Sequence, residues 1–157
     1  MNITLRPIEP DDLPFLYQVY AATREEELAP TGWDAAQKEA FLTMQFTAQH
    51  QHYQEHYTGA AFQIILVDGQ PAGRLYVARW PREIRIVDIA LLPAYRNAGI
   101  GTRLLRDLMA EAAQADKSLS IHVEQFNPAL RLYTRLGFAQ TGEYGVYYRM
   151  DWTPGEP

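Results

Sequence analysis

The spacing of apolar side chains in the first third of the chain predicts one strand followed by two helices. Residues 3–6 alternate between apolar and polar side chains, which is typical of a short, half-buried strand. A helix with one apolar face follows, capped by an aspartate of the 11–12 pair, and it ends where the Pro-Thr-Gly sequence at 30–32 interrupts the pattern. Asp34 is suited to cap a second helix, which runs to about Tyr57.

The middle of the chain predicts three strands. The segments 62–67 and 71–80 are rich in β-branched and aromatic side chains, and the Asp-Gly pair at 68–69 between them is a strong signal for a tight hairpin. Residues 84–91 form a nearly continuous apolar run, which is typical of a strand that is buried on both faces.

The next segments alternate between helix and strand. A stripe of leucines and small residues over 104–112 predicts a long helix, and 119–123 predicts a fifth strand. The Asn-Pro pair at 127–128 can open another helix through Leu136, with Gly137 in the C′ position that ends it.

The tail of the chain completes the expected sheet. Residues 138–152 predict two more strands with Gly142 and Gly145 between them. The whole order of strands and helices predicts an α/β fold, a mixed sheet with helices on its faces. Because the chain has 157 residues, no linker and no internal repeat, we expect one domain over residues 1–157.

Composition and charge remove several classes of function. The chain has 14 lysines and arginines against 19 aspartates and glutamates, a net charge of −5, and no basic cluster, so we expect no nucleic-acid binding. It has no apolar run long enough to span a membrane and no secretory signal at its start, so we expect no membrane partner and a cytoplasmic location. The absence of cysteine excludes a cysteine nucleophile, disulfides and thiolate metal sites.

The most informative stretch is residues 92–105, which connect the apolar strand to the leucine-rich helix. Gly99 and Gly101 lie where that helix starts, and a helix N-terminus offers unpaired N–H groups and a partial positive charge to a phosphate. Arg96 can add a charged contact. On spacing alone, a plain strand-to-helix turn explains these glycines equally well. No lysine follows the second glycine and Leu104 stands where a third glycine is needed, so neither a P-loop nor a dinucleotide fingerprint fits.

Two motifs together resemble those of a known enzyme superfamily. The first is Arg96-x-x-Gly99-x-Gly101, after a strand that ends in Leu-x-Pro. The second is the run 127–138, Asn-Pro-Ala-Leu-Arg-Leu-Tyr-Thr-Arg-Leu-Gly-Phe. Their form, order and separation resemble the GNAT superfamily of acetyl-CoA-dependent N-acetyltransferases. The resemblance implies a mixed, mainly antiparallel sheet of about six or seven strands, flanked by four helices, whose fourth and fifth strands splay apart.

The resemblance also implies which residues hold acetyl-CoA, as a co-substrate and without a metal. The backbone of Ile89, Ala90 and Leu91 would hydrogen-bond the pantetheine arm like an added strand, and Asn127 would contact the same arm. Tyr133 would protonate the departing thiolate, a role that suits a neutral phenol; the alternative is a core tyrosine with a satisfied hydroxyl. The pyrophosphate would be wrapped by the residues of the glycine loop: Arg96, Asn97, Ala98, Gly99, Ile100, Gly101 and Thr102.

The sequence leaves several candidates for the base that takes the proton of the amine. These are Asp88, His122, Glu83 and Glu124, all near the expected splay. His122 alternates with apolar neighbours, so we expect it to face the cleft, and a base that titrates near neutrality suits histidine. Asp88 alternates with isoleucines, so an Asp88–His122 pair would be either a proton relay or a buried structural pair.

Other polar and aromatic residues are weaker candidates. His50, His52 and His56 fall in the second expected helix without the carboxylate of a metal site, so we interpret them as part of a polar helix face. The resemblance places the first two helices at the acceptor site. The candidate acceptor contacts are Trp33, Tyr53, Tyr57, the Glu25–Glu27 run, Tyr147 and Tyr148.

Three functions remain open at this point. The first is transfer of an acetyl group from acetyl-CoA to a primary amine, on a small molecule or a peptide, by direct attack in a ternary complex. The alternatives are an inactive CoA-binding sensor or interaction domain and a transferase for another acyl group. Because exposed tail strands in this fold often pair, the resemblance also allows a homodimer.

Overall fold

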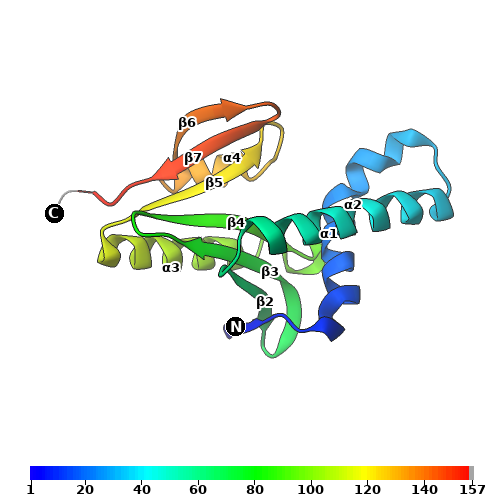
Figure 1. Ribbon diagram of the computed structural model, residues 1–157, viewed down its shortest axis with the longest axis horizontal. Coiled ribbons are helices and arrows are strands. Elements are labelled where there is room, and N and C mark those ends of the chain that lie inside the picture. Colours follow the sequence, from blue (N-terminus) through cyan, green and yellow to red (C-terminus); the bar gives the residue numbers. More distant parts are fainter. Residues whose placement is uncertain (156–157) are drawn as a thin grey trace. The chain divides into compact units, whose positions relative to one another are not determined.

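A computed structural model describes residues 1–155 of the chain (Figure 1). Over this range the chain forms seven strands and four α-helices, joined in places by short 3₁₀ turns. The strands are β1 (Ile3–Pro7), β2 (Ala61–Val67), β3 (Gln70–Arg79), β4 (Glu83–Leu91), β5 (Ser118–Glu124), β6 (Ala139–Tyr144) and β7 (Tyr147–Trp152). The helices are α1 (Leu13–Leu28), α2 (Ala35–His56), α3 (Ile100–Ala115) and α4 (Leu130–Arg135).

The strands form one sheet in the order β1-β2-β3-β4-β5-β7-β6. β4 and β5 run parallel, whereas β1–β2, β5–β7 and β6–β7 are antiparallel. The parallel ladder between β4 and β5 ends at the pair Ile86–Ile121, although β4 continues to Leu91 and β5 to Glu124. The expected mixed sheet with four helices is therefore confirmed, and the ladder between the fourth and fifth strands ends early, as expected of a splay between them.

By its internal contacts the chain divides into two compact units, and each is described by itself. The first comprises residues 1–75 and 90–96. In it, α1 and α2 pack through aromatic rings: those of Tyr17 and Tyr20 lie 5.9 and 6.0 Å from the ring of Phe46. These rings supply the apolar contact that the weakly amphipathic α2 otherwise lacks.

The two helices of this unit begin differently. Asp34 caps α2 as expected and accepts a 2.8 Å hydrogen bond from the N–H of Gln37. Asp12 stands in the N-cap position of α1, but its side chain does not cap that helix. It accepts two 2.8 Å bonds from Arg6 instead, and one of 2.7 Å from the N–H of Glu9. The expected aspartate cap of α1 is wrong because the guanidinium is a stronger, charge-assisted partner.

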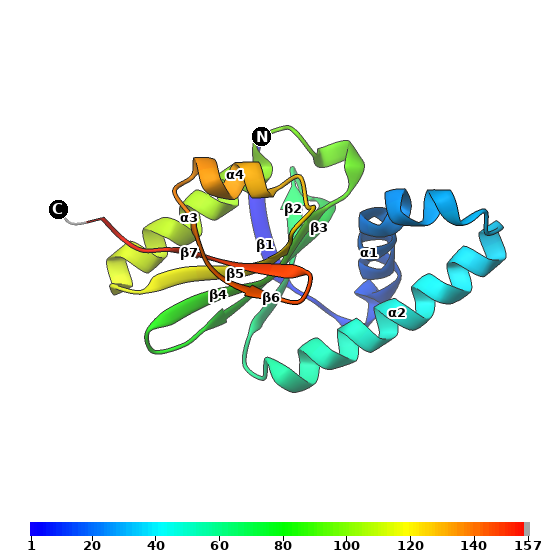
Figure 2. The same cartoon turned by 90° about the horizontal axis from the view of Figure 1, so that it is seen from above.

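The second unit comprises residues 76–89 and the described residues from 97 onward. Helices α3 and α4 lie on the same side of β4, β5 and β7 (Figure 2). The stripe expected on α3 forms the core with alternate residues of the strands. The buried side chains are Leu104, Leu105, Leu108, Ile84, Ile86, Leu119 and Ile121, none more than 5% exposed.

In this unit α3 starts at the glycines where it is expected, whereas α4 starts later than the sequence predicts. Residues 93–95 form a 3₁₀ turn, and α3 begins at Ile100 after an irregular loop. α4 begins at Leu130 because Asn127 forms a turn, in which its Oδ1 accepts a 2.9 Å bond from the N–H of Ala129. Gly137 does follow the end of α4, with φ 102°, as expected of a C′ glycine.

The C-terminal hairpin of β6 and β7 differs from the sequence prediction in the position of one glycine. Gly145, with φ 61°, lies in the turn between β6 and β7, as expected. Gly142 is inside β6, and the pairing with β7 shifts between Gln140 and Gly142. Thr141 is therefore the extra residue of a β-bulge, which the alternation of residue types did not reveal.

Candidate functional site

The end of β4 lies very close to β3. An ideal Cβ on Gly73 would lie 2.1 Å from the carbonyl oxygen of Ala90, so only glycine fits there. Beyond this contact the N–H of Leu92 donates to the carbonyl of Ala72 at 2.8 Å. The side chain of Arg96 turns back, and its Nε donates a 3.0 Å bond to the carbonyl of Leu91. These contacts fix the course of the residues expected to meet the pantetheine arm.

The loop before α3 has the geometry of an anion site. Asn97 and Gly99 have positive φ values of 60° and 82°, and Gly99 is the N-cap without a side-chain cap. The N–H of Arg103 donates to the carbonyl of Gly99 at 3.0 Å, so the N–H groups of residues 100–102 precede the first intrahelical bond. A Cβ on Gly101 would have no atom within 4 Å, so space is open at this helix end. Such a turn can receive a phosphate.

Tyr133, the tyrosine of the second motif, is buried. It lies in α4, is 4% exposed, and packs edge-on against Phe138 with ring centroids 5.6 Å apart. Burial, and then the negative charge of Asp88, raise the pKa of the Tyr133 phenol above its ordinary value. The hydroxyl therefore keeps its proton throughout the neutral range and can act as a donor.

An open pocket of about 630 Å³ adjoins the start of α4. Asn127, expected to contact the pantetheine arm, is one of its walls. Because Oδ1 of Asn127 is used in the turn described above, its amide N–H₂ group is the part suited to a ligand. The lining residues are Gln125, Phe126, Asn127, Pro128, Leu130 and Arg131.

His122 projects from β5 on the face opposite its buried neighbours. Ile121 and Val123 are each 4% exposed, whereas His122 is exposed, as the alternation predicts. His122 pairs in register with Arg149 of β7, and its ring centroid lies 5.7 Å from that of Tyr144. Partial burial lowers the pKa of His122, as do the positive charges of Arg85 and Arg149, against the opposing effect of Glu83 and Asp151.

Asp88 and His122 have different neighbours in the structure. The charge of Asp88 acts on Tyr133, on the side of β4 and β5 that faces α4. The charged groups that act on His122 are those of the opposite face. This separation favours the structural interpretation of Asp88 over a relay to His122.

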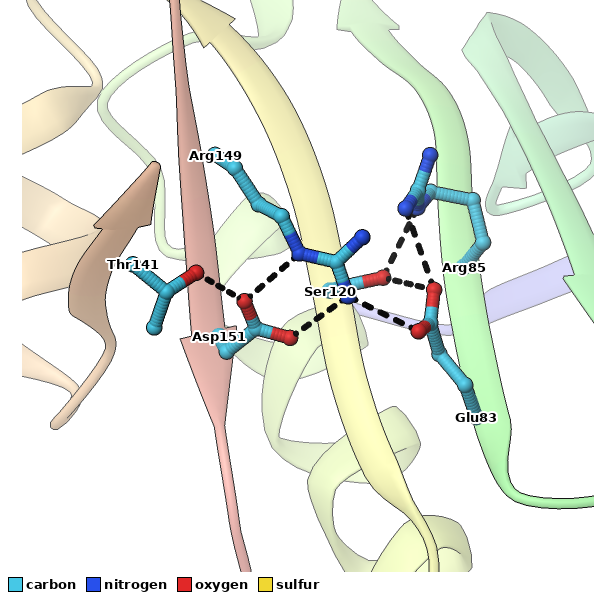
Figure 3. Close-up of polar contacts among 6 residues, drawn as sticks. All are labelled: Glu83, Arg85, Ser120, Thr141, Arg149 and Asp151. Atoms are coloured by element: carbon cyan, nitrogen blue, oxygen red, sulfur yellow. Dashed lines mark hydrogen bonds and ion pairs between the residues drawn. The ribbon is translucent and has the colours of Figure 1, made fainter. Parts of the chain in front are cut away.

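Polar side chains from four strands form a cross-strand cluster (Figure 3). One of them, Arg149, pairs in register with His122. Glu83 Oε2 accepts bonds from Ser120 (2.7 Å) and Arg85 (3.0 Å), and Glu83 Oε1 accepts one from Arg149 (2.8 Å). Arg149 also donates to both oxygens of Asp151, at 2.9 and 3.1 Å, and Thr141 donates to Asp151 as well. The members of the cross-strand cluster are Glu83, Arg85, Ser120, Thr141, Arg149 and Asp151.

Of this cluster only Glu83 is among the candidates that the sequence suggests, as a possible base. Desolvation alone would raise the pKa of Glu83, but hydrogen bonds from Ser120 and Arg149 outweigh it and lower that pKa. A carboxylate so well paired is a poor proton acceptor. The available signal was the alternation of opposite charges, Glu83 with Arg85 and Arg149 with Asp151, within two strands.

The candidate acceptor contacts fall into both units. In the first unit, Trp33 packs on Phe41 with centroids 5.3 Å apart and stays 38% exposed. Glu27 of the acidic run pairs with Arg24 at 2.8 Å. In the second unit, Tyr147 is 41% exposed at the β6–β7 turn. Each of the two aromatic residues offers an exposed ring within its own unit.

Comparisons with known proteins identify the family of the chain. A family model described as the acetyltransferase (GNAT) family matches residues 16–138. The N-alpha-acetyltransferase RimI of Mycobacterium tuberculosis is 36% identical over 95 residues, which cover 60% of this chain and 59% of that protein. An N-alpha-acetyltransferase of Sulfurisphaera tokodaii is 30% identical over 104 residues, 57% of this chain and 62% of that protein. The chain thus spans about three fifths of the length of these curated relatives.

A solved structure extends the likeness to almost the whole fold. The PaiA N-acetyltransferase of Thermoplasma acidophilum, determined in complex with coenzyme A, superposes with a TM-score of 0.72. It is 16% identical, and the match covers 98% of this chain and 99% of that chain. Within residues 1–155, no helix is both long and apolar enough to cross a membrane.

Proposed function

Because the chain belongs to the acetyltransferase (GNAT) family, we propose that it transfers an acetyl group from acetyl-CoA to the α-amino group of a peptide or protein. The two curated relatives, both named N-alpha-acetyltransferases, support an α-amine as acceptor. The coenzyme A in the related PaiA structure supports the donor. The family match draws on residues of both units, which supports one acetyltransferase domain.

The proposed transfer is a direct attack of the amine on acetyl-CoA in a ternary complex. A covalent cysteine relay is impossible, because the chain contains no cysteine to carry the acetyl group. Acetyl-CoA supplies the thioester carbonyl. The amine nitrogen forms a bond to that carbonyl carbon while the carbon–sulfur bond breaks. The amine gives up a proton to a base, and the sulfur leaves as a thiolate that takes a proton from an acid.

The observation that carries the proposal is the burial of Tyr133 with its proton retained. Tyr133 matches the tyrosine of the family motif and is 4% exposed in α4. Because burial and Asp88 raise its pKa, the phenol is a neutral donor at every physiological pH. We assign Tyr133 as the acid that protonates the thiolate.

The donor would be held by residues 89–91 and 96–102, with Asn127. The N–H groups at the start of α3 are suited to the pyrophosphate, because they and the helix dipole favour an anion. The end of β4, beyond its ladder with β5, offers main-chain groups to the pantetheine amides. The amide of Asn127 offers a further donor to the same arm.

His122 is proposed as the base. An α-amine is largely protonated at neutral pH, since its ordinary pKa is about 7.7–8.0, and it must lose a proton before it attacks. Because the pKa of His122 is lowered, its imidazole is neutral and ready to accept that proton at pH 7.

The proposal is tested by measuring thiol release from acetyl-CoA with three acceptors. These are a lysine-free peptide with a free N-terminus, an N-terminally blocked peptide with one lysine, and a polyamine. We expect thiol release only with the lysine-free peptide that has a free N-terminus. Because the chain has no cysteine, a thiol reagent reports only the CoA formed. Tight acetyl-CoA binding without release from any acceptor would instead identify a sensor, and release with the lysine peptide alone would contradict the α-amine.

A further inference from the structure

His122 shares one face of the sheet with the cross-strand cluster. Along β5, Ser120 and His122 are two residues apart and therefore point to the same side. In the antiparallel register with β7, Ser120 is opposite Asp151 and His122 is opposite Arg149. Side chains at directly opposite positions are nearest neighbours on a sheet face. Arg149 is thus directly opposite His122, and the two carboxylates that Arg149 binds, Glu83 and Asp151, belong to the same cluster.

The two carboxylates of the cluster are already engaged by other donors. Glu83 accepts from Arg85, Ser120 and Arg149, and Asp151 accepts twice from Arg149 and once from Thr141 (Figure 3). A carboxylate without such partners beside a histidine would stabilise the charged imidazolium. Arg149 is common to both carboxylates, and its own ionisation is fixed, since a guanidinium does not lose its proton in proteins.

We propose that Arg149 is a positioning residue of the reaction: by binding Glu83 and Asp151 it keeps both carboxylates from His122, which stays neutral and able to accept the proton of the amine. This inference rests on the proposed function, in which His122 is the base. Arg85 has the same effect on Glu83 from β4, and it is 6% exposed, so its position is fixed by packing.

Other charged and titratable groups also lie near His122. The neighbours of His122 come from β4, β5, β6 and β7. The charged and titratable ones are Glu83 and Arg85 of β4, Glu124 of β5, Tyr144 of β6, and Tyr147, Arg149 and Asp151 of β7. The lowered pKa of His122, to which both arginines contribute, agrees with the proposal.

The experiment is an NMR-detected pH titration of the His122 ring in the full chain, with H122Q used for assignment. Arg149→Met keeps the apolar stem and removes the charge. It should raise the His122 pKa to or above the ordinary value of about 6.5, because the positive charge opposite the ring is lost and both carboxylates lose the guanidinium that they share. Arg149→Lys, which keeps the charge, should leave the pKa lowered. Arg103→Met on α3, which removes a guanidinium from an exposed pair, is the control and should not change it.

A second measurement tests the role in the reaction. In Arg149→Met the acidic limb of kcat/KM should move to higher pH, so that activity at pH 6 falls by about threefold or more relative to pH 8. The double variant R149M/D151N removes one positive and one negative charge. The pKa of His122 and the acidic limb of kcat/KM should both return toward those of the unmodified chain. A merely structural Arg149 would lower activity equally at all pH values.

Several results would overturn the inference. One is an unchanged His122 pKa in a folded Arg149→Met chain. Another is a raised pKa with an unmoved acidic limb, which would remove Arg149 from the reaction while acetyl transfer itself stands. If Arg149→Met does not fold, Glu83→Gln and Asp151→Asn should each lower the His122 pKa further, and a rise or no change would contradict the proposal. If the unmodified chain acetylates no amine, the proposed function is refuted. The titration does not depend on that result, so it still tests the effect of Arg149 on the pKa of His122.

Discussion

The carbonyl oxygen of Ala90 occupies the place where a side chain on Gly73 would begin, 2.1 Å from an ideal Cβ. The Cα of Leu91 would be 3.0 Å from the same point. Both obstacles are backbone atoms, so neither can rotate away. The close approach of β3 thus fixes the end of β4 that we propose to meet the donor.

The first prediction is that Gly73→Ala destabilises the chain by about 2–3 kcal/mol, since an added methyl must displace a strand. Urea unfolding followed by circular dichroism measures this. Gly155→Ala, at a position with open space around it, is the matched control and should unfold like the unmodified chain. Equal midpoints for the two variants would contradict the close approach.

At the start of α3, Gly101→Glu should abolish acetyl-CoA binding without unfolding the chain. A Cβ at this position meets no atom within 4 Å, so the fold accepts the side chain, but the new carboxylate repels the pyrophosphate and blocks its approach. Isothermal calorimetry measures the affinity. Gly101→Ala adds bulk without charge and separates the two effects. Unchanged affinity in a folded Gly101→Glu chain would show that the phosphates bind elsewhere.

Removal of the Tyr133 hydroxyl, the proposed acid, should slow turnover without weakening acetyl-CoA binding. Tyr133→Phe should lower kcat by about 10²-fold or more and leave the Kd for acetyl-CoA nearly unchanged, because the hydroxyl acts only on the departing thiolate. Because the pKa of Tyr133 is raised, its deprotonation should not limit activity below about pH 10. Steady-state kinetics and thermal melts together decide the role. Normal turnover with a lowered Tm would make Tyr133 a structural residue.

The proposed base should be visible in the pH–rate profile. Since the active form of His122 is neutral and its pKa is lowered, the acidic limb of kcat/KM should lie below pH 6.5. His122→Gln should remove this limb and reduce kcat/KM for the amine at unchanged acetyl-CoA affinity. The same limb in the Gln variant would leave Glu124 or solvent as the base.

The cross-strand cluster should make stability depend on pH. Desolvation alone would raise the pKa of Asp151, but bonds from Arg149 and Thr141 outweigh it and lower that pKa. A lowered folded-state pKa contributes stability that is present above the unfolded value of about 3.9 and is lost as pH falls through the folded value. Asp151→Asn should therefore reduce the free energy of unfolding at pH 7 and flatten its decline below pH 4. Asp107→Asn, on the exposed side of α3, is the control in urea titrations at both pH values.

The features that the sequence predicts correctly are determined by residues that are close together in the chain. The turn at 68–69 has positive φ at both positions, 50° and 80°, because aspartate and glycine tolerate this conformation. Asp34 caps α2 through the N–H of Gln37, three residues further on. Tyr133 and the glycines before α3 were found through motifs whose members lie within a few residues of one another. The family resemblance that rested on these motifs is confirmed by the match over residues 16–138.

The features that the sequence did not predict depend on residues far apart in the chain. Glu83 and Arg149 are 66 positions apart and meet only because β5 lies between their strands. The constraint on Gly73 comes from Ala90, a residue of the next strand. Asp12 was expected to cap α1, but β1 brings Arg6 to it. Register and strand order decide such contacts, and local patterns carry no information on either.

The bulge at Thr141 also bears on how copies of the chain could associate. β6 is the outermost strand of the sheet, and its outer side is where another strand could add. The shift between Gln140 and Gly142 breaks the regular spacing of main-chain groups after only two residues of that strand. A second copy could not continue the sheet there in register, so we expect β6 to resist edge-to-edge aggregation.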